Sequence, residues 1–162
     1  MIVHGGAWDI PDEEVEAHQG GCRQALLAGW EILKAGGRAL DAVERAIVVM
    51  EDDPTFDAGV GSFLNAEGVV ELDAGLMDGH DLNAGAVAVV HNIKNPITLA
   101  RRVLASEYVY IIGPGATRFA TEVGLEECQP QELIVEREWK RWEEHSSTPW
   151  DIFGGETVGA VA

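Results

Sequence analysis

The sequence has few cysteines, few positive charges and no long hydrophobic run. Cysteine occurs only at Cys22 and Cys128, which is too few for a disulfide framework or a zinc site. Lysine and arginine number 11 against 28 aspartates and glutamates, so the formal net charge is -17. Because like charges repel, we expect neither nucleic acid nor an anionic membrane surface as a partner. The apolar runs are also too short to span a membrane.

The apolar content is nevertheless sufficient for a folded core. Hydrophobic residues make up 46% of the 162 positions, which predicts one ordered domain rather than a disordered chain. The N-terminus reads MIVHGGAW, without a basic segment or a long apolar stretch, so we expect no signal peptide and a cytoplasmic location. Cys22 falls on the apolar face of a helical pattern and is interpreted as a small core residue.

Apolar spacing in the first half predicts a short strand followed by two helices. Residues 2–3 form a β-type pair that leads into a glycine turn. Helical spacing extends from 12 to 35 and ends at two glycines, and a second helix is predicted over 40–50. Residues 51–65 contain a proline and several glycines, which exclude a regular helix there.

The second half alternates between strand and helix patterns. Residues 70–77 alternate apolar and polar side chains, which predicts a half-buried strand. Residues 85–90 are apolar on both faces, which predicts a central strand covered on both sides. Asn95 is predicted to cap a helix that begins at Pro96. We expect a further strand at 108–112 and a further helix at 116–123.

The composition changes after Gly124. Residues 125–156 are predicted to form a variable linker, in which Trp139 and Trp142 share one helical face. Its last part, 146–156, is rich in serine, threonine, proline and glycine, and predicts exposed chain where a cut is tolerated. The alternation of strands and helices indicates an α/β or an α+β fold, and the pattern alone does not separate the two.

A threonine near the end of the chain, in the stretch GGETVGAVA, raises a chemical question. A threonine hydroxyl needs a nearby base to become a nucleophile, and an α-amine, with an ordinary pKa near ~8, can serve. That amine exists at Thr157 only if the bond after Glu156 is cut. Thr157 can make the cut itself if its Oγ1 attacks the Glu156 carbonyl and water hydrolyses the resulting ester. The alternative is an ordinary strand residue, because β-branched side chains favour strands.

Four stretches together resemble a known family. They are VHGGAW, LDAVERAIVVMEDDPTFDAGVGSFLNAEGVVELDAGLMDG, AGAVAVVHNIKNPITLARRV and TVGAVA, in residues 2–123 and 157–162. They are similar to the plant-type asparaginases, or isoaspartyl aminopeptidases, which are N-terminal-nucleophile hydrolases. The resemblance implies an α+β fold, a four-layer αββα sandwich, of which this chain holds about half. Residues 1–156 would form the first (alpha) subunit and 157–162 the start of the second (beta) subunit.

The resemblance also implies an activity. The family's precursor cleaves itself before the residue matched by Thr157, then hydrolyses asparagine or isoaspartyl dipeptides through an acyl-enzyme, without a catalytic cofactor. The related glycosylasparaginases share this plan and stay open as an alternative. Further active-site residues of the family follow the last stretch, so we expect this truncated or uncleaved chain to be inactive alone. A different reading is a non-catalytic subunit or scaffold, which associates with itself or with a separate second half.

Particular residues receive roles from the resemblance. His4, Gly5 and Gly6 would belong to an active-site loop, and Asp57 would orient the nucleophile. Many relatives have asparagine at the position of Asp57, and an ionised aspartate cannot donate a hydrogen bond. Relatives often have glycine or aspartate at the position of Glu156, so its larger side chain is expected to slow cleavage.

A loop after the second helix resembles the family's sodium site. The resemblance implies a structural sodium bound by backbone carbonyls, which suit a hard cation. Their residues would be Met50, Glu51, Asp53, Phe56, Ala58 and Val60. Without the resemblance, the same loop is an ordinary tight turn. We expect the carboxylates of Glu51, Asp52 and Asp53 to be solvated surface charge, and an open apolar sheet face to favour a homo-oligomer or an alpha/beta heterotetramer.

Overall fold

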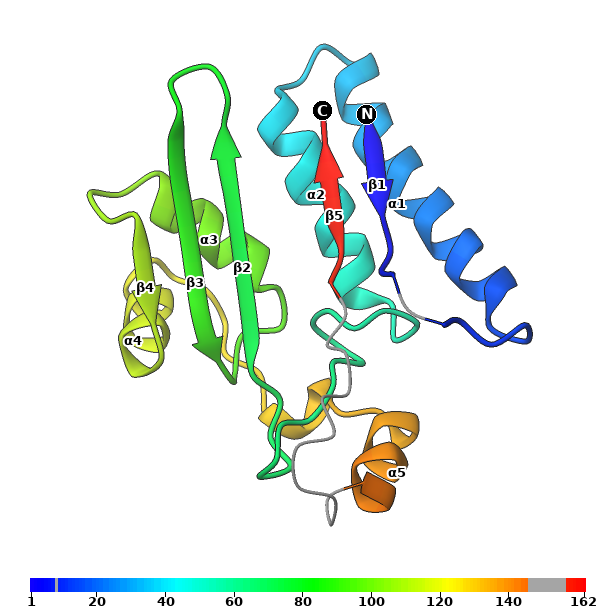
Figure 1. The fold of residues 1–162 in the computed structure, drawn as a ribbon. Coiled ribbons are helices and arrows are strands. Elements are labelled where there is room, and N and C mark those ends of the chain that lie inside the picture. The colour runs from blue at the N-terminus through cyan, green and yellow to red at the C-terminus, as the bar shows by residue number, and fades with distance from the viewer. Residues whose placement is uncertain (8, 146–156) are drawn as a thin grey trace.

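The computed structural model describes residues 1–7, 9–145 and 157–162, and mixes helices with small sheets (Figure 1). In chain order the elements are β1 (Ile2–His4), α1 (Val15–Lys34), α2 (Ala39–Asp52), β2 (Leu72–Asp78), β3 (Asn83–Val90), α3 (Pro96–Leu104), β4 (Tyr110–Ile112), α4 (Pro114–Glu122), the 3₁₀ helix η1 (Pro130–Leu133), α5 (Glu136–His145) and β5 (Gly159–Val161). The fold is therefore of a mixed α/β kind. Among the described residues, no helix is long and apolar enough to cross a membrane.

The two ends of the chain pair with each other as strands. β5 runs antiparallel to β1, with Ile2 opposite Val161 and His4 opposite Gly159. Figure 1 shows the blue and red strands side by side, with the N and C labels at the same end. The strand predicted at 2–3 is confirmed, and its partner comes from more than 150 residues away along the chain.

A second sheet has the strand order β2–β3–β4. β2 and β3 are antiparallel, whereas β3 and β4 are parallel. The half-buried strand predicted at 70–77 is confirmed, because Leu72 is buried while Asp73 and Met77 are exposed. The central position predicted for residues 85–90 is also confirmed, since β3 lies between the other two strands.

Helix α3 packs on one face of this sheet, behind it in the view of Figure 1. Gly85 of β3 makes the close approach possible, because a Cβ there would lie 2.5 Å from the carbonyl oxygen of Ala100. Leu99 and Val103 of α3 are fully buried against the strands. This layer of helix on sheet forms one hydrophobic core of the molecule.

The opposite face of the same sheet borders an open cavity. Met77, Ala86 and Tyr110 line this cavity. Met77 and Tyr110 are 55% and 60% exposed. Within the described residues, the strand at 85–90 is therefore covered on one face only, and the other is the open apolar sheet face that the sequence analysis expects.

A second hydrophobic core lies among α1, α2 and the β1–β5 pair. Met50 of α2 and Phe56 of the following loop are almost completely buried there. Val158 and Ala160 pack against the same cluster, so β5 rests on α2. Cys22 lies at the edge of this core, as predicted.

The predicted boundaries are close to the observed ones but not identical. The helix expected from residue 12 begins at Val15, and the strand expected over 108–112 is limited to Tyr110–Ile112. Asn95 and Pro96 occupy the predicted N-cap and first position of α3. The predicted capping by the Asn95 side chain is wrong, because its amide donates instead to Asp52, at 3.2 Å.

The predicted linker contains regular structure in its described part. Residues 125–145 include η1 and α5, and residues 146–156 lie outside the described part of the chain. The shared helical face predicted for Trp139 and Trp142 is confirmed, with ring centroids 5.1 Å apart. The subunit boundary at 156/157 stays a prediction.

Candidate active site

The pairing of the chain ends positions Thr157. This residue immediately precedes Val158 and strand β5, and its side chain is exposed. Its hydroxyl has a long contact of 3.5 Å to the carbonyl oxygen of Val158. Because β5 lies beside β1, the threonine is brought close to the turn at 4–6 that follows β1. Glu156, the predicted residue before the cleavage point, lies outside the described residues.

The glycine turn packs directly on the interior. A Cβ at Gly5 would lie 2.5 Å from Cys22 Sγ and 2.7 Å from the ring of Phe56. We expect only glycine to fit there, because a Cβ would displace the Phe56 ring, which is almost completely buried. Gly6 has a φ of 113°, and its amide donates to His4 Nδ1 at 3.2 Å. Close packing thus explains the glycine at position 5, and the positive φ explains the glycine at position 6.

Cys22 is not a competing nucleophile at this place. Burial, and then the nearby carboxylate of Asp53, raise the pKa of the Cys22 thiol. A thiol must ionise to attack a carbonyl carbon, so a raised pKa keeps it inert near neutral pH. The interpretation of Cys22 as a core residue agrees with this electrostatic environment.

Asp57 is held by the loop in which it lies. Its Oδ1 accepts a hydrogen bond of 2.8 Å from the main-chain N–H of Phe63. The bond closes the segment 57–63 and fixes the direction of the half-buried carboxylate. A donor from the main chain is a fixed partner, so the second oxygen of Asp57 has a defined orientation for further contacts.

Thr157 and Asp57 line one open cavity of about 1270 Å³, which lies between the β5 strand and the β2–β3–β4 sheet. Val158 and Phe63 also line it. The structure therefore brings the predicted nucleophile and the predicted orienting residue to one space. The turn residues His4, Gly5 and Gly6 do not line this cavity and lie next to β5 instead.

The loop with the predicted cation ligands is compact and rich in converging carbonyl groups. Gly59 and Gly61 have φ values of 59° and 98°. A Cβ at Gly61 would lie 2.7 Å from Pro54 O and 3.0 Å from Phe56 O. Such a concentration of main-chain oxygens fits the preference of a hard cation.

Some of these oxygens already accept hydrogen bonds. The carbonyls of Met50, Glu51 and Asp53 accept main-chain amide protons from Asp53, Val60 and Phe56. Each carbonyl oxygen has a second lone pair, so these bonds do not exclude a cation. Among the described residues, no group of three His, Cys, Asp or Glu side chains is placed to hold a metal ion. A cation in this loop would thus depend on main-chain oxygens.

The expectation that Glu51 is a solvated surface charge is wrong. Its side chain is 2% exposed, and its Oε1 accepts a hydrogen bond of 3.0 Å from the Ile97 amide. Burial raises the pKa of Glu51 to about 8, against the opposing effect of that amide. Asp52 is exposed as expected, and it pairs with Lys94 at 2.8 Å. The sequence alone does not distinguish the buried Glu51 from the exposed Asp52, because the two acidic residues are adjacent.

Sequence reasoning also missed residues around the cavity. Ser62 is buried, and its hydroxyl has no hydrogen-bond partner in the described structure. Phe63 supplies the amide that binds Asp57, and its ring contacts Arg141 of α5. No local pattern in the sequence distinguishes these residues, because their roles depend on contacts between segments far apart in the chain.

Comparison with known proteins identifies the family. The sequence profile of the family described as Asparaginase matches residues 1–151, and the chain belongs to this family. The isoaspartyl peptidase/L-asparaginase of Xenopus laevis is 44% identical over 167 residues, with 100% of this chain and 54% of the relative covered. The plant-type L-asparaginase of Thermococcus kodakarensis is 49% identical over 146 residues, with 89% of this chain and 46% of the relative covered.

A mammalian relative is also matched over only about half of its own length. The isoaspartyl peptidase/L-asparaginase of Bos taurus is 47% identical over 169 residues, with 100% of this chain and 55% of the relative covered. The chain spans about half the length of the curated relatives it matches. The resemblance found in the sequence motifs is thus confirmed at the level of the family.

Proposed function

We propose that the protein is an amide hydrolase that acts on asparagine or on β-aspartyl (isoaspartyl) dipeptides, with Thr157 as the nucleophile. The observation that carries the proposal is the position of Thr157, two residues before the strand that pairs with β1, on the cavity that Asp57 also lines. The printed names of relatives, isoaspartyl peptidase/L-asparaginase and plant-type L-asparaginase, support this substrate class.

Maturation is the first chemical step that we propose. Thr157 Oγ1 attacks the carbonyl carbon of Glu156, and its proton passes to the departing amide nitrogen. The peptide bond becomes an ester, which water hydrolyses to a carboxylate on Glu156 and a free hydroxyl on Thr157. The new α-amine has an ordinary pKa near ~8, so a useful fraction is neutral near pH 7 and can act as a base.

Hydrolysis of the substrate uses the same hydroxyl. The neutral α-amine takes the Oγ1 proton while Oγ1 attacks the side-chain amide carbon of asparagine. Ammonia leaves with that proton, or an amino acid leaves in the case of an isoaspartyl dipeptide, and an acyl-enzyme ester remains on Thr157. Water then releases aspartate. Asp57 is proposed to hold Thr157 in orientation, which is the contribution that positioned groups make to such attacks.

No catalytic cofactor enters this chemistry. We propose a structural sodium in the loop 50–60, held by the backbone carbonyls of Met50, Glu51, Asp53, Phe56, Ala58 and Val60. The positive φ values of Gly59 and Gly61 support it, because they turn main-chain oxygens toward one another. The ion would fix the loop that carries Asp57.

The open face of the β2–β3–β4 sheet supports a proposal about the whole fold. Met77, Tyr110 and Ile112 are each more than half exposed. Apolar side chains grouped in this way favour burial by another surface. We propose that a second sheet covers them in a four-layer αββα sandwich, and that the protein assembles as a homo-oligomer or an alpha/beta heterotetramer.

We also propose a cytoplasmic location. The free thiols of Cys22 and Cys128 support it, because thiols stay reduced in that compartment.

The test compares residues 1–162 alone with a chimera in which they continue in frame into the remaining length of the Bos taurus relative. Each is made with threonine, serine or alanine at position 157. Intact-mass spectrometry reports cleavage before Thr157, and ammonia or amino-acid release reports hydrolysis of asparagine, a β-aspartyl dipeptide and glycosylasparagine.

We expect the chimera to cleave and hydrolyse, the Thr157→Ser form to do both more slowly, and the Thr157→Ala form to do neither. A Thr157→Ala chimera that still releases ammonia at the parent rate would overturn the proposal. Hydrolysis of glycosylasparagine in preference to the other substrates would replace the proposed substrate class with that alternative. A parent chimera that releases nothing from any substrate would favour the scaffold interpretation.

A further inference from the structure

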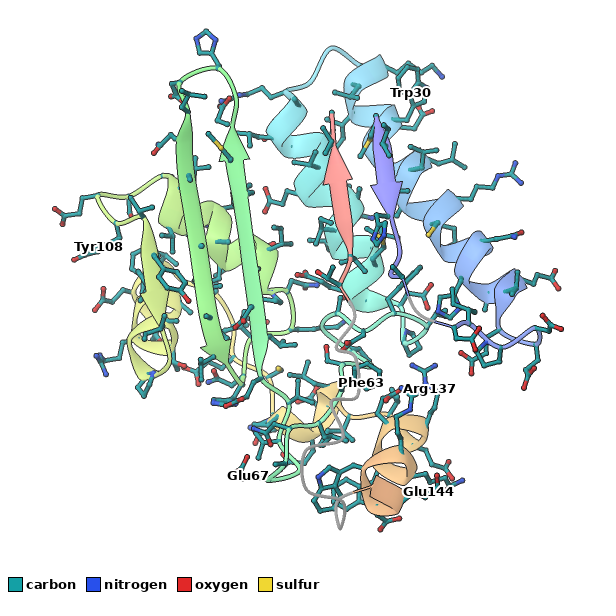
Figure 2. All side chains as sticks on the ribbon, viewed as in Figure 1. Trp30, Phe63, Glu67, Tyr108, Arg137 and Glu144 are labelled. Atoms are coloured by element: carbon teal, nitrogen blue, oxygen red, sulfur yellow. The ribbon has the colours of Figure 1, made fainter. Side chains whose placement is uncertain are left out.

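Helix α5 makes contacts that a plain linker would not need. It packs against the loop 53–68, which contains Asp57 and follows the end of α2. Figure 1 shows α5, in orange, beside this loop, and Figure 2 labels Phe63 and Arg137 in the region where the two segments meet. The contacts are of four kinds, and each involves a different residue of the segment 133–142.

Two arginines of α5 are oriented by one buried carboxylate. Glu138 is 2% exposed, and its two oxygens accept hydrogen bonds from Arg137 Nε at 2.6 Å and from Arg141 Nη1 at 3.1 Å. A buried carboxylate with both oxygens bound to guanidinium groups is a satisfied network. The arrangement limits the rotamers of both arginines, so their remaining donors point in fixed directions.

Each arginine then contacts the loop. Arg137 Nη2 donates to the carbonyl oxygen of Pro54 at 3.0 Å. The guanidinium carbon of Arg141 lies 4.7 Å from the centroid of the Phe63 ring, which is the geometry of a cation–π contact. Phe63 in turn donates its main-chain N–H to Asp57. A continuous path therefore leads from α5 through Phe63 to the Asp57 carboxylate.

Two further contacts hold the same loop at other points. The amide of Gly61 donates to the carbonyl oxygen of Leu133, just before α5, at 2.9 Å. The ring of Trp142 covers Gly68, where a Cβ would lie 3.0 Å from the indole. Four contacts distributed over one loop restrain it more firmly than any one of them, because each limits the motion left by the others.

We propose that α5 is a positioning element of the active site, whose Arg137 and Arg141, aligned by Glu138, hold Pro54 and Phe63 and thereby orient Asp57. In this proposal, α5 is the part of the predicted linker 125–156 that supports the active site. The proposal rests on the proposed function for the role of Asp57, whereas its structural part, the restraint of the loop, is measurable without any activity.

The test uses amide hydrogen exchange in the full 162-residue chain. The reporter is the Phe63 amide, and the control reporter is the Ala86 amide, which bonds to Val109 in the distant sheet. We expect Arg141→Met to accelerate exchange at Phe63 about two- to fivefold, the range of a cation–π contact, and to leave Ala86 unchanged. Arg141→Lys keeps a cation and restores part of the protection.

A matched control is Arg118→Met, on the exposed surface of α4, which should change neither amide. Equal acceleration at Phe63 and Ala86 in Arg141→Met would overturn the proposal, since it would indicate general destabilisation. Unchanged exchange at Phe63 would overturn it as well. Arg137→Met removes the contact with Pro54 instead and should accelerate exchange at Phe63 in the same way.

Kinetics separate this proposal from the proposed function. In whichever form of the protein hydrolyses asparagine, Arg141→Met should lower kcat about two- to tenfold with KM unchanged, because orientation of the nucleophile and not substrate binding is affected. An unchanged kcat with faster Phe63 exchange would overturn the positioning role. A parent protein that hydrolyses nothing would refute the proposed function instead, and the exchange data would still decide whether α5 restrains the loop.

Discussion

The side-chain carboxyl group of Glu51 caps helix α3, because its Oε1 accepts a hydrogen bond of 3.0 Å from the Ile97 amide. Glu51 lies next to the last residue of α2, and Ile97 is the second residue of α3. The first amides of a helix lack partners within the helix, so an acceptor from elsewhere stabilises its start. Because the adjacent Asn95 does not cap the helix with its side chain, Glu51 supplies this acceptor and joins α2 to α3.

Replacement of Glu51 by glutamine should change the pH dependence of stability. The pKa of Glu51 rises from 4.5 to about 8 on folding because the group is buried. A raised acid pKa means that the folded state binds the proton more tightly, so its stabilisation is present below pH 4.5 and is lost as the pH rises toward 8. Glutamine keeps the acceptor but does not titrate. Between about pH 5 and pH 8, unfolding free energies from urea titrations should shift in favour of Glu51→Gln by on the order of 3 kcal/mol.

The control for this measurement is Asp52→Asn, which changes the neighbouring exposed carboxylate. Asp52 is adjacent in the chain but exposed, so its replacement should leave the pH dependence close to that of the parent. Parallel stability curves for the parent and Glu51→Gln over the same pH range would contradict the raised pKa of Glu51.

The error about Glu51 shows where sequence reasoning reached its limit. The helical spacing of Ile47 and Glu51 places both on one face of α2, and this face is buried. The residue type instead predicts an exposed side chain, because carboxylates are mostly exposed. The partner that resolves the conflict, the Ile97 amide, is 46 residues away, and no local pattern reports such a contact.

The adjacent glycines of α1 should respond in opposite ways to alanine. A Cβ at Gly21 would lie 2.6 Å from the Phe56 ring and 2.8 Å from Asp53 Oδ2, whereas a Cβ at Gly20 meets nothing within 4 Å. We expect Gly21→Ala to destabilise the protein by about 1–3 kcal/mol through overpacking. Gly20→Ala should stabilise it by up to about 1 kcal/mol, because alanine is the better helix former.

Urea unfolding at one pH measures both glycine variants side by side. The two positions share a helix and are adjacent in the chain, so each is the control for the other. Destabilisation of similar size at both positions would contradict the packing of α1 against Phe56.

Asparagine in place of Asp57 should be tolerated, and alanine should not. The asparagine side chain would keep an oxygen that accepts the Phe63 amide proton and would add a donor, while alanine leaves that amide without its partner. In a form of the protein that hydrolyses asparagine, we expect Asp57→Asn to stay within about threefold of the parent kcat and Asp57→Ala to lose at least about tenfold. Steady-state kinetics with asparagine measure this, and equal rates for the two variants would contradict an orienting role for Asp57.

The structure also shows which parts of the site the sequence could predict. The strand at 70–77 and the helix starting at Pro96 follow from local spacing, and both are confirmed. The HGG turn and Thr157 were singled out by a family resemblance and by hydroxyl chemistry, but their proximity depends on the pairing of β1 with β5. The pairing of two strands far apart in the chain depends on the whole fold, so the spacing of apolar residues in the sequence does not predict it.

Removal of sodium should lower the thermal stability if the loop 50–60 binds this ion. A ligand that binds only the folded state stabilises it by RT ln(1 + [L]/Kd), so ~100 mM sodium at a Kd of ~10 mM would contribute about 1.4 kcal/mol. For a chain of this size that corresponds to a decrease of about 3–6 °C in Tm on exchange of sodium chloride for choline chloride. Choline at the same concentration keeps the ionic strength equal but is too large to enter a ring of carbonyl groups. Calorimetry in the two salts measures this difference. Equal Tm values would contradict the proposed sodium site and would not affect the proposed role of Thr157.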